Sequence, residues 1–137
     1  MAYSDLRNKV ESAVSALVAA AVGATVYTAS SAEELVLPRV VVEANDFTEA
    51  NAETGNYYAN VSVAVASSAD DSTLAEHDAL VAAAFDVVLT DTLPASLSAV
   101  AGLHVHGIVS TEIKAAREDR HWVDTVTVRL MCCADDQ

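Results

Sequence analysis

The stretch YYANVSVAVAS, residues 57–67, is the strongest indication of the fold, because apolar and small or polar side chains alternate along it without interruption. Its two faces are Val61, Val63 and Val65 on one side and Asn60, Ser62 and Ala64 on the other. Strict alternation over this length is the pattern of a strand with one buried face. This segment is therefore the clearest strand in the chain, and the other elements are placed around it.

One helix is predicted before this strand and one after it. The first begins at Ser4, whose hydroxyl can cap it, and ends at Gly23. Its apolar stripe consists of Leu6, Val10, Ala13, Val14, Leu17, Val18 and Ala21. The second begins with a capping box of Thr73 and Glu76 and ends before Pro94. Its apolar stripe consists of Leu74, His77, Leu80, Val81, Ala84, Phe85, Val88 and Leu89.

Four further segments are predicted to be strands, from their β-branched content and alternation: residues 24–28, 35–43, 103–111 and 121–133. Pro38 puts the start of the second of these at an edge or a bulge. Three polar segments connect the elements: a turn over residues 30–34, an exposed acidic loop over 44–56, and an exposed connection over 114–120. Residues 95–101 could add a helical turn.

The resulting order is α-β-β-β-α-β-β, in which helices do not alternate strictly with strands. This order favours an α+β fold over a doubly wound parallel sheet. We expect a mostly antiparallel sheet of about four to five strands with two helices packed on one face. A chain of 137 residues with 53% hydrophobic residues suits one domain spanning residues 1–137.

Composition excludes several classes of function. The net charge of -13 disfavours binding to nucleic acid phosphates. The apolar stretch over residues 13–26 is interrupted and too short for a membrane span, and no signal peptide pattern precedes it, so we expect the protein to stay in the cell that makes it. Cys132 and Cys133 are adjacent and imply no disulfide framework. Only four glycines occur, so a phosphate-binding loop has little to be built from.

No residue cluster carries a catalytic signature, and we expect no enzyme activity, no metal and no cofactor. The strongest metal candidate is His104-x-His106, to which His121 or Glu112 could add a ligand from the next strand. A polar outward strand face explains the same pattern. A small metal-dependent or acid/base enzyme that uses these histidines and the many carboxylates is thus the alternative from a different class.

Charge is instead separated along the chain. The acidic segment holds Glu43, Asp46, Glu49 and Glu53, and the basic connection holds Lys114, Arg117 and Arg120. Arg129 stands alone on a weakly polar strand face. Patches of opposite sign suit a head-to-tail contact between copies that closes into a ring. These eight residues are the candidate contacts to other subunits or partners.

The layout of the chain resembles the phage tail terminator proteins, also called tail-completion or head-to-tail joining proteins. The resemblance covers nearly the whole chain and is carried by YSDLRNKVESAVSALVAAAV, LPRVVVEAND, NYYANVSVAVASS, STLAEHDALVAAAFDVVL and REDRHWVDTVTVRLMC. It implies a homo-oligomeric ring, a hexamer in that family, that caps the tail tube, ends its polymerisation and joins it to the head-side connector protein.

The resemblance also implies a virion protein of the tail or neck that is assembled in the host cytoplasm. DNA would pass through the lumen without sequence-specific binding, and no membrane would be involved. A strongly acidic subunit suits a passage that must not retain DNA. Because neck proteins share related folds, a head-side connector or neck adaptor of the same virion is the alternative within this class.

Overall fold

A computed structural model describes residues 3–23, 25–28, 37–51, 56–100, 102–118 and 120–134. It contains three helices and five strands: α1 (Tyr3–Ala21), β1 (Thr25–Thr28), β2 (Arg39–Asn51), β3 (Asn56–Ser68), α2 (Leu74–Val88), α3 (Leu93–Ser98), β4 (Leu103–Glu118) and β5 (His121–Ala134). The strands form one sheet in the order β1-β2-β3-β5-β4. Only the β1–β2 pair is parallel, so the predicted α+β class with a mostly antiparallel sheet is confirmed.

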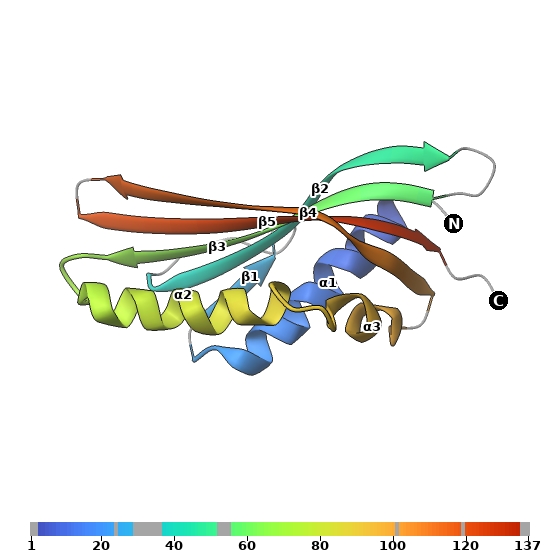
Figure 1. The fold of residues 1–137 in the computed structure, drawn as a ribbon. Helices are drawn as coiled ribbons and strands as arrows, with labels where there is room; N and C mark the ends of the chain where they lie inside the picture. The colour runs from blue at the N-terminus through green and yellow to red at the C-terminus, as the bar shows by residue number, and fades with distance from the viewer. Residues whose placement is uncertain are drawn as a thin grey trace.

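The central strand β3 behaves as its alternation predicts. Val61, Val63 and Val65 are buried, whereas Ser62 and Ala64 on the opposite face are only partly covered. The same alternation continues on the neighbouring strands, where the buried members are Val40, Val42, Ala44, Val126, Val128, Leu130 and Cys132. Figure 1 shows α1, α2 and α3 on the same side of the sheet, so the core lies between this sheet face and the helices.

Both predicted helices form, but α1 begins at Tyr3, so Ser4 lies inside the helix and is not its cap. On α1, Leu6, Val10, Val14 and Val18 are buried at four-residue spacing against the sheet. The capping box of α2 is present: the Thr73 hydroxyl accepts from the Glu76 amide at 3.1 Å, and the Thr73 amide donates to the Glu76 carboxylate at 2.9 Å. The carboxylate is stabilised by this backbone bond and by the Thr73 side chain, which lower the pKa of Glu76.

Two expected stripe residues of α2 are not in the core. Leu74 and Leu89 are exposed, because they stand at the two ends of the helix, beyond the part that packs on the sheet. A third helix, α3, follows from Pro94 near its start, in the region where one added helical turn was expected. Its Leu93 and Leu97 are fully buried, so this short helix belongs to the core.

Two connections predicted from polar composition are wrong. β2 continues to Asn51 and β3 begins at Asn56, so most of the expected acidic loop over residues 44–56 is a strand pair with two register shifts. β4 continues to Glu118, so the expected connection over 114–120 is mostly strand as well. In both places, backbone pairing to a long neighbour outweighs the weak strand preference of Asp, Asn, Glu and Lys. The expected turn over residues 30–34 lies outside the described residues.

Candidate assembly surface

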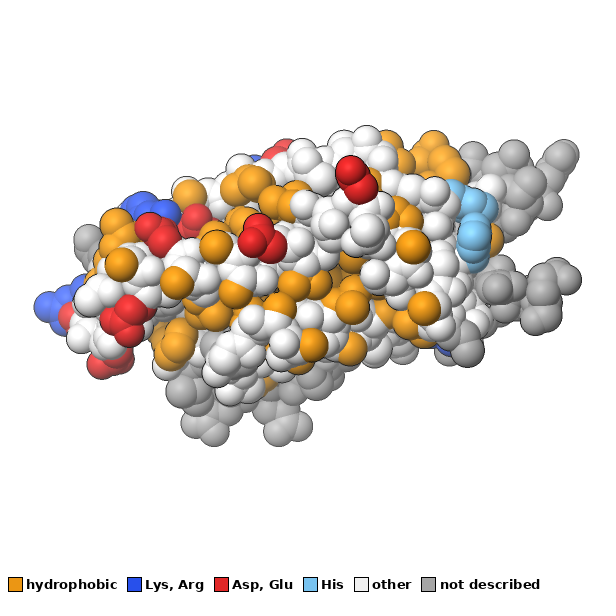
Figure 2. Space-filling view, turned by 60° about the horizontal axis from the view of Figure 1, so that its bottom comes forward, with side chains coloured by type: hydrophobic (Ala, Val, Ile, Leu, Met, Phe, Trp, Pro, Cys, Tyr) orange, Lys and Arg blue, Asp and Glu red, His pale blue; other side chains and the backbone are white. Residues whose placement is uncertain are grey.

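The basic residues lie toward the β4–β5 turn, and Asp46 and Glu49 lie on the second half of β2, but Glu43 is level with Glu112 across the sheet, close to the level of Lys114. In Figure 1 the end of β4 and the start of β5 are at the left, and the end of β2 and the start of β3 are at the right. Figure 2 shows Lys and Arg side chains at this left end together with Asp and Glu side chains, and His side chains toward the other end. The exposed acids Asp70 and Asp71 lie near Arg120, so the separation of charge along the sequence remains a prediction.

The three basic residues differ in how firmly they are held. Lys114 contacts Glu112 at 3.2 Å, and both side chains are mostly exposed. Arg120 contacts Asp70 at 3.6 Å, again at the surface. It occupies the left-handed region with φ 63°, which a tight turn between β4 and β5 requires. Exposed pairs of this kind contribute little to stability, so these cations can change partner at low cost.

Arg117 is anchored instead. Its guanidinium donates to the Asp124 carboxylate at 2.6 Å, and this hydrogen bond raises the pKa of Arg117. Asp124 is largely buried, with 13% of its side chain exposed. Arg117 is therefore tied into the body of the protein and is less able than Lys114 or Arg120 to engage another subunit.

Of the acidic group, only Glu43 has a described side chain. It lies partly buried on β2, where its carboxylate accepts from the Asn45 side chain at 2.6 Å. Asp46 and Glu49 belong to the outer half of β2, but their side chains are outside the described part, and Glu53 is outside it altogether. The structure thus places two of these acids on a strand, not on a loop.

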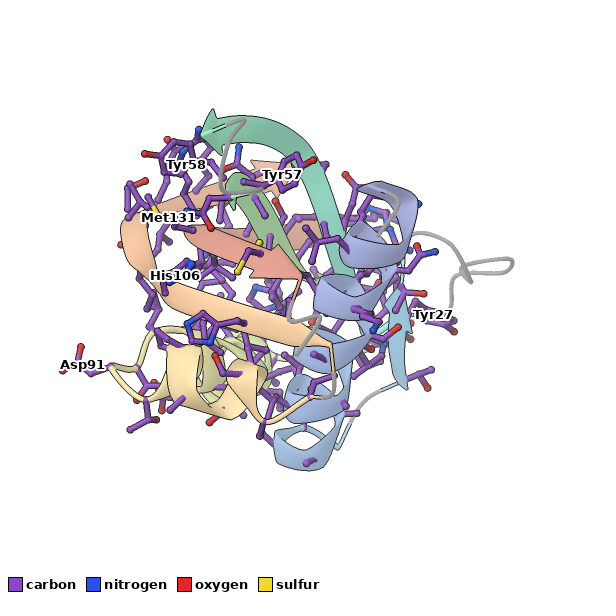
Figure 3. All side chains as sticks on the ribbon, turned by 90° about the vertical axis from the view of Figure 1, so that its right-hand side faces the viewer. Tyr27, Tyr57, Tyr58, Asp91, His106 and Met131 are labelled. Atoms are coloured by element: carbon purple, nitrogen blue, oxygen red, sulfur yellow. The ribbon has the colours of Figure 1, made fainter. Side chains whose placement is uncertain are left out.

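Arg129 lies on the sheet face opposite the helices. Its guanidinium stacks 4.7 Å from the centre of the Tyr58 ring and donates to the Asn60 side chain at 3.2 Å. The residue lines a polar hollow of about 280 Å³ together with Asn60, Ser110, Glu112 and Thr127. Figure 3 shows Tyr58 on the same side as Met131, its partner on β5. Arg129 is thus presented in a fixed orientation on this face, as an interface residue requires.

The histidine pair does not assemble a metal site among the described residues. The rings of His104 and His106 are 4.5 Å apart, and His106 contacts the Asn56 side chain at 3.2 Å and the Cys133 sulfur at 3.6 Å. No group of three His, Cys, Asp or Glu in the described chain is arranged to hold an ion. His121, which was expected to approach, pairs with Glu118 at the far end of the sheet.

The most connected polar group in the core was not predicted. His77 of α2 is 1% exposed, with Nδ1 2.8 Å from the Ser67 hydroxyl and Nε2 3.0 Å from Asp124. A carboxylate only accepts, so Nε2 carries a proton directed at Asp124. Arg117 completes the network, and Trp122 packs beside the imidazole with ring centres 5.7 Å apart.

These residue types occur in serine hydrolases, but the arrangement suits a structural clamp. In a hydrolase the serine faces Nε2 and the aspartate faces Nδ1, whereas His77 uses the reverse pairing. Ser67 is 1% exposed and so cannot reach a substrate in this conformation. The network fastens α2 to β3 and β5, and through Arg117 to the basic end of β4.

The Cys132 thiol is unsuited to covalent chemistry. Burial, and to a lesser extent the neighbouring Cys133, raise the pKa of Cys132 to about 12. A thiol with such a pKa stays protonated and unreactive near neutral pH. Cys133 is only partly buried, so it is the accessible thiol of the pair.

Comparison with known proteins shows the fold of the chain. No protein-family profile matches the sequence, and no curated protein matches it. Among solved structures, a chain of the structure described as "Virion of native gene transfer agent (GTA) particle" shares the fold with a TM-score of 0.61 and 16% sequence identity. The similarity covers 98% of this chain and 100% of that chain. Among the described residues, no helix combines the length and apolar character of a membrane span.

Proposed function

We propose that this protein is a structural component of a tailed phage or phage-like virion. The observation that supports this role is the similarity in fold to a chain of a gene transfer agent virion, which extends over nearly the full length of both chains. The similarity covers nearly all of both chains, so it concerns the whole fold and not a single motif. The polar residues of the described structure are consistent with an assembly role, because they form the buried His77 network and ion pairs at the surface.

Within the virion, we propose that the protein forms a ring, a hexamer, that caps the tail tube, ends its polymerisation and joins the tail to the head-side connector. The position of Lys114 and Arg120 toward the β4–β5 turn and of Asp46 and Glu49 on the second half of β2 supports this role, because a ring between two partners needs two different faces. The basic end, with Lys114 and Arg120, would contact one partner, and the acidic end, with Asp46 and Glu49, would contact the other. Arg117 and Glu43 support these ends from the sheet, and Arg129 is a further contact.

The overall charge of -13 fits a subunit around a DNA passage. Because the acidic subunits repel the phosphates of the passing DNA, the DNA can slide through the lumen without being retained. The same charge keeps unassembled subunits apart in the host cytoplasm until a partner surface is available. The protein would act without a cofactor.

Deletion of the gene in the phage or particle that carries it tests this function. We expect tails of uncontrolled length in electron micrographs, because nothing stops the polymerisation of the tube. Tails of normal length beside heads that leak DNA would instead identify the protein as a head-side connector or neck adaptor. Normal, infectious particles would contradict a virion role. Complementation with the wild-type gene is the control.

A further inference from the structure

The outer edge of β4 is the most exposed regular element of the described chain. Every residue from Val109 to Arg117 is exposed on both faces of the strand, including the aliphatic side chains Val109 (51%) and Ile113 (57%). Within the described residues, β5 is the only strand that pairs with β4, and it lies on the other edge. A long strand edge with unpaired backbone groups is a template for pairing with another chain.

Elsewhere the protein covers such edges. The Ser98 hydroxyl bonds both the amide and the carbonyl of Val105, at 2.9 and 3.3 Å, on the first part of β4. At the other side of the sheet, the buried Glu11 carboxylate of α1 accepts from the Ala44 amide at 3.1 Å, just beyond the last β2 residue that β1 covers. Ile113 pairs with the buried Val126, so its side chain is on the sheet face that the helices cover. The helix α2 packs on β3 and β5, however, and leaves Ile113 exposed. The second half of β4 is thus left open while comparable groups nearby are capped.

We infer that this open half of β4 pairs with β1 of a second copy, so that the sheet continues from one subunit to the next around the ring. The inference rests on the proposed function, because a ring requires two different edges to meet. β1 and β4 are the two outermost strands and form opposite edges of the same sheet. Figure 3 shows this separation, with Tyr27 of β1 at one side and His106 of β4 at the other.

Strand direction supports β1 as the partner. β1 runs parallel to β2, and three antiparallel pairings then separate β2 from β4, so β1 and β4 run in opposite directions. A rotation about an axis parallel to the strands leaves those directions unchanged. Side-by-side copies therefore meet as an antiparallel pair, the more stable arrangement for two edge strands.

The register of the strands also supports pairing between β4 and β1 of the next copy. The pairings across the sheet put Tyr27 level with Lys114, through the intervening partners Val41, Ala64 and Thr125. Both side chains point to the face opposite the helices, because their neighbours across the sheet lie on the uncovered face. In a planar ring, Lys114 of one copy then meets Tyr27 of the next, which places an ammonium beside an aromatic ring. The adjacent Ile113 loses its exposure to solvent in the same contact.

Cysteine cross-linking tests this contact. In a Cys133→Ser background, Cys132 remains buried and unreactive, so only the added cysteines form disulfide cross-links. The test variant carries Tyr27→Cys and Lys114→Cys, and it is oxidised after native mass spectrometry has given its oligomeric state. The two positions within one copy are separated by the width of the sheet, about 19 Å, so a disulfide between them joins different copies.

The expected result is a ladder of covalent oligomers on a denaturing gel. The matched control carries Tyr27→Cys and Ser110→Cys, a shift of about 13 Å along β4, and should give roughly tenfold less cross-linking. Rings without cross-linking would overturn the inference and leave the proposed function intact. A covalent dimer from Lys114→Cys alone would also overturn it, because β4 would then pair with itself. Protein that stays monomeric at every concentration would contradict both the inference and the ring.

Discussion

Replacing Asp124 by alanine removes the acceptor that His77 and Arg117 share. The His77 Nε2 proton is then left without a partner in the core, since the imidazole is 1% exposed and has no route to water. An unpaired buried donor costs about 1–3 kcal/mol. We expect the free energy of unfolding to fall by about 1–3 kcal/mol, or roughly 3–9 °C in Tm.

The pH dependence of this loss gives a second check. Burial alone would raise the pKa of Asp124, but the hydrogen bonds from Arg117 and His77 outweigh it and lower that pKa. A carboxyl with a lowered pKa in the folded protein binds fewer protons there than in the unfolded chain. Its stabilising effect is therefore complete above the unfolded value of about 4 and is lost as the pH falls through the folded pKa. The difference between wild type and Asp124→Ala should narrow in this acidic range.

Urea unfolding followed by circular dichroism at neutral and acidic pH measures both effects. Asp86→Ala on the exposed side of α2 is the matched control and should change the free energy of unfolding by less than about 0.5 kcal/mol. An Asp124→Ala variant as stable as this control would refute the clamp. A difference from wild type that stays constant on acidification would refute the role of the carboxylate charge.

Three further outcomes are expected. A thiol reagent should modify Cys133 in the folded protein, with Cys132 reacting only after denaturation; two equally fast thiols would show that Cys132 is not buried. Thr73→Ala should lower the free energy of unfolding by about 1 kcal/mol through loss of the helix cap, measured by urea unfolding; no loss would mean that the cap is not formed. Lys114→Glu with Arg120→Glu should prevent incorporation into particles while Tm changes by only about 3 °C, and normal incorporation would exclude the basic end as a contact.

The parts of the fold that follow from short-range pattern were predictable. The alternation around Val63 and the capping box at Thr73 specify local structure by themselves, and both predictions are confirmed. The predictions for the second half of β2 and the end of β4 were wrong. These segments form strands because they pair with β3 and β5, and not because of their own residues. Local composition carries no record of such a partner.

The buried network shows the same limit. His77 was placed on the apolar stripe of α2, which is correct for its position, but its partner Asp124 is 47 residues away in sequence. Glu11, which follows Val10, is buried in the core. From sequence alone, a charged residue on a helix suggests a face exposed to solvent. A histidine inside an apolar stripe and a lone aspartate within a β-rich strand are the signals that could have prompted a search for such partners.

We propose that this chain is a structural part of the joint between head and tail. Immunogold labelling of intact particles, with particles from a deletion strain as the control, tests this position. We expect gold at the junction of the head and the tail tube. Purified particles without label, and without peptides of this chain in mass spectrometry, would contradict it.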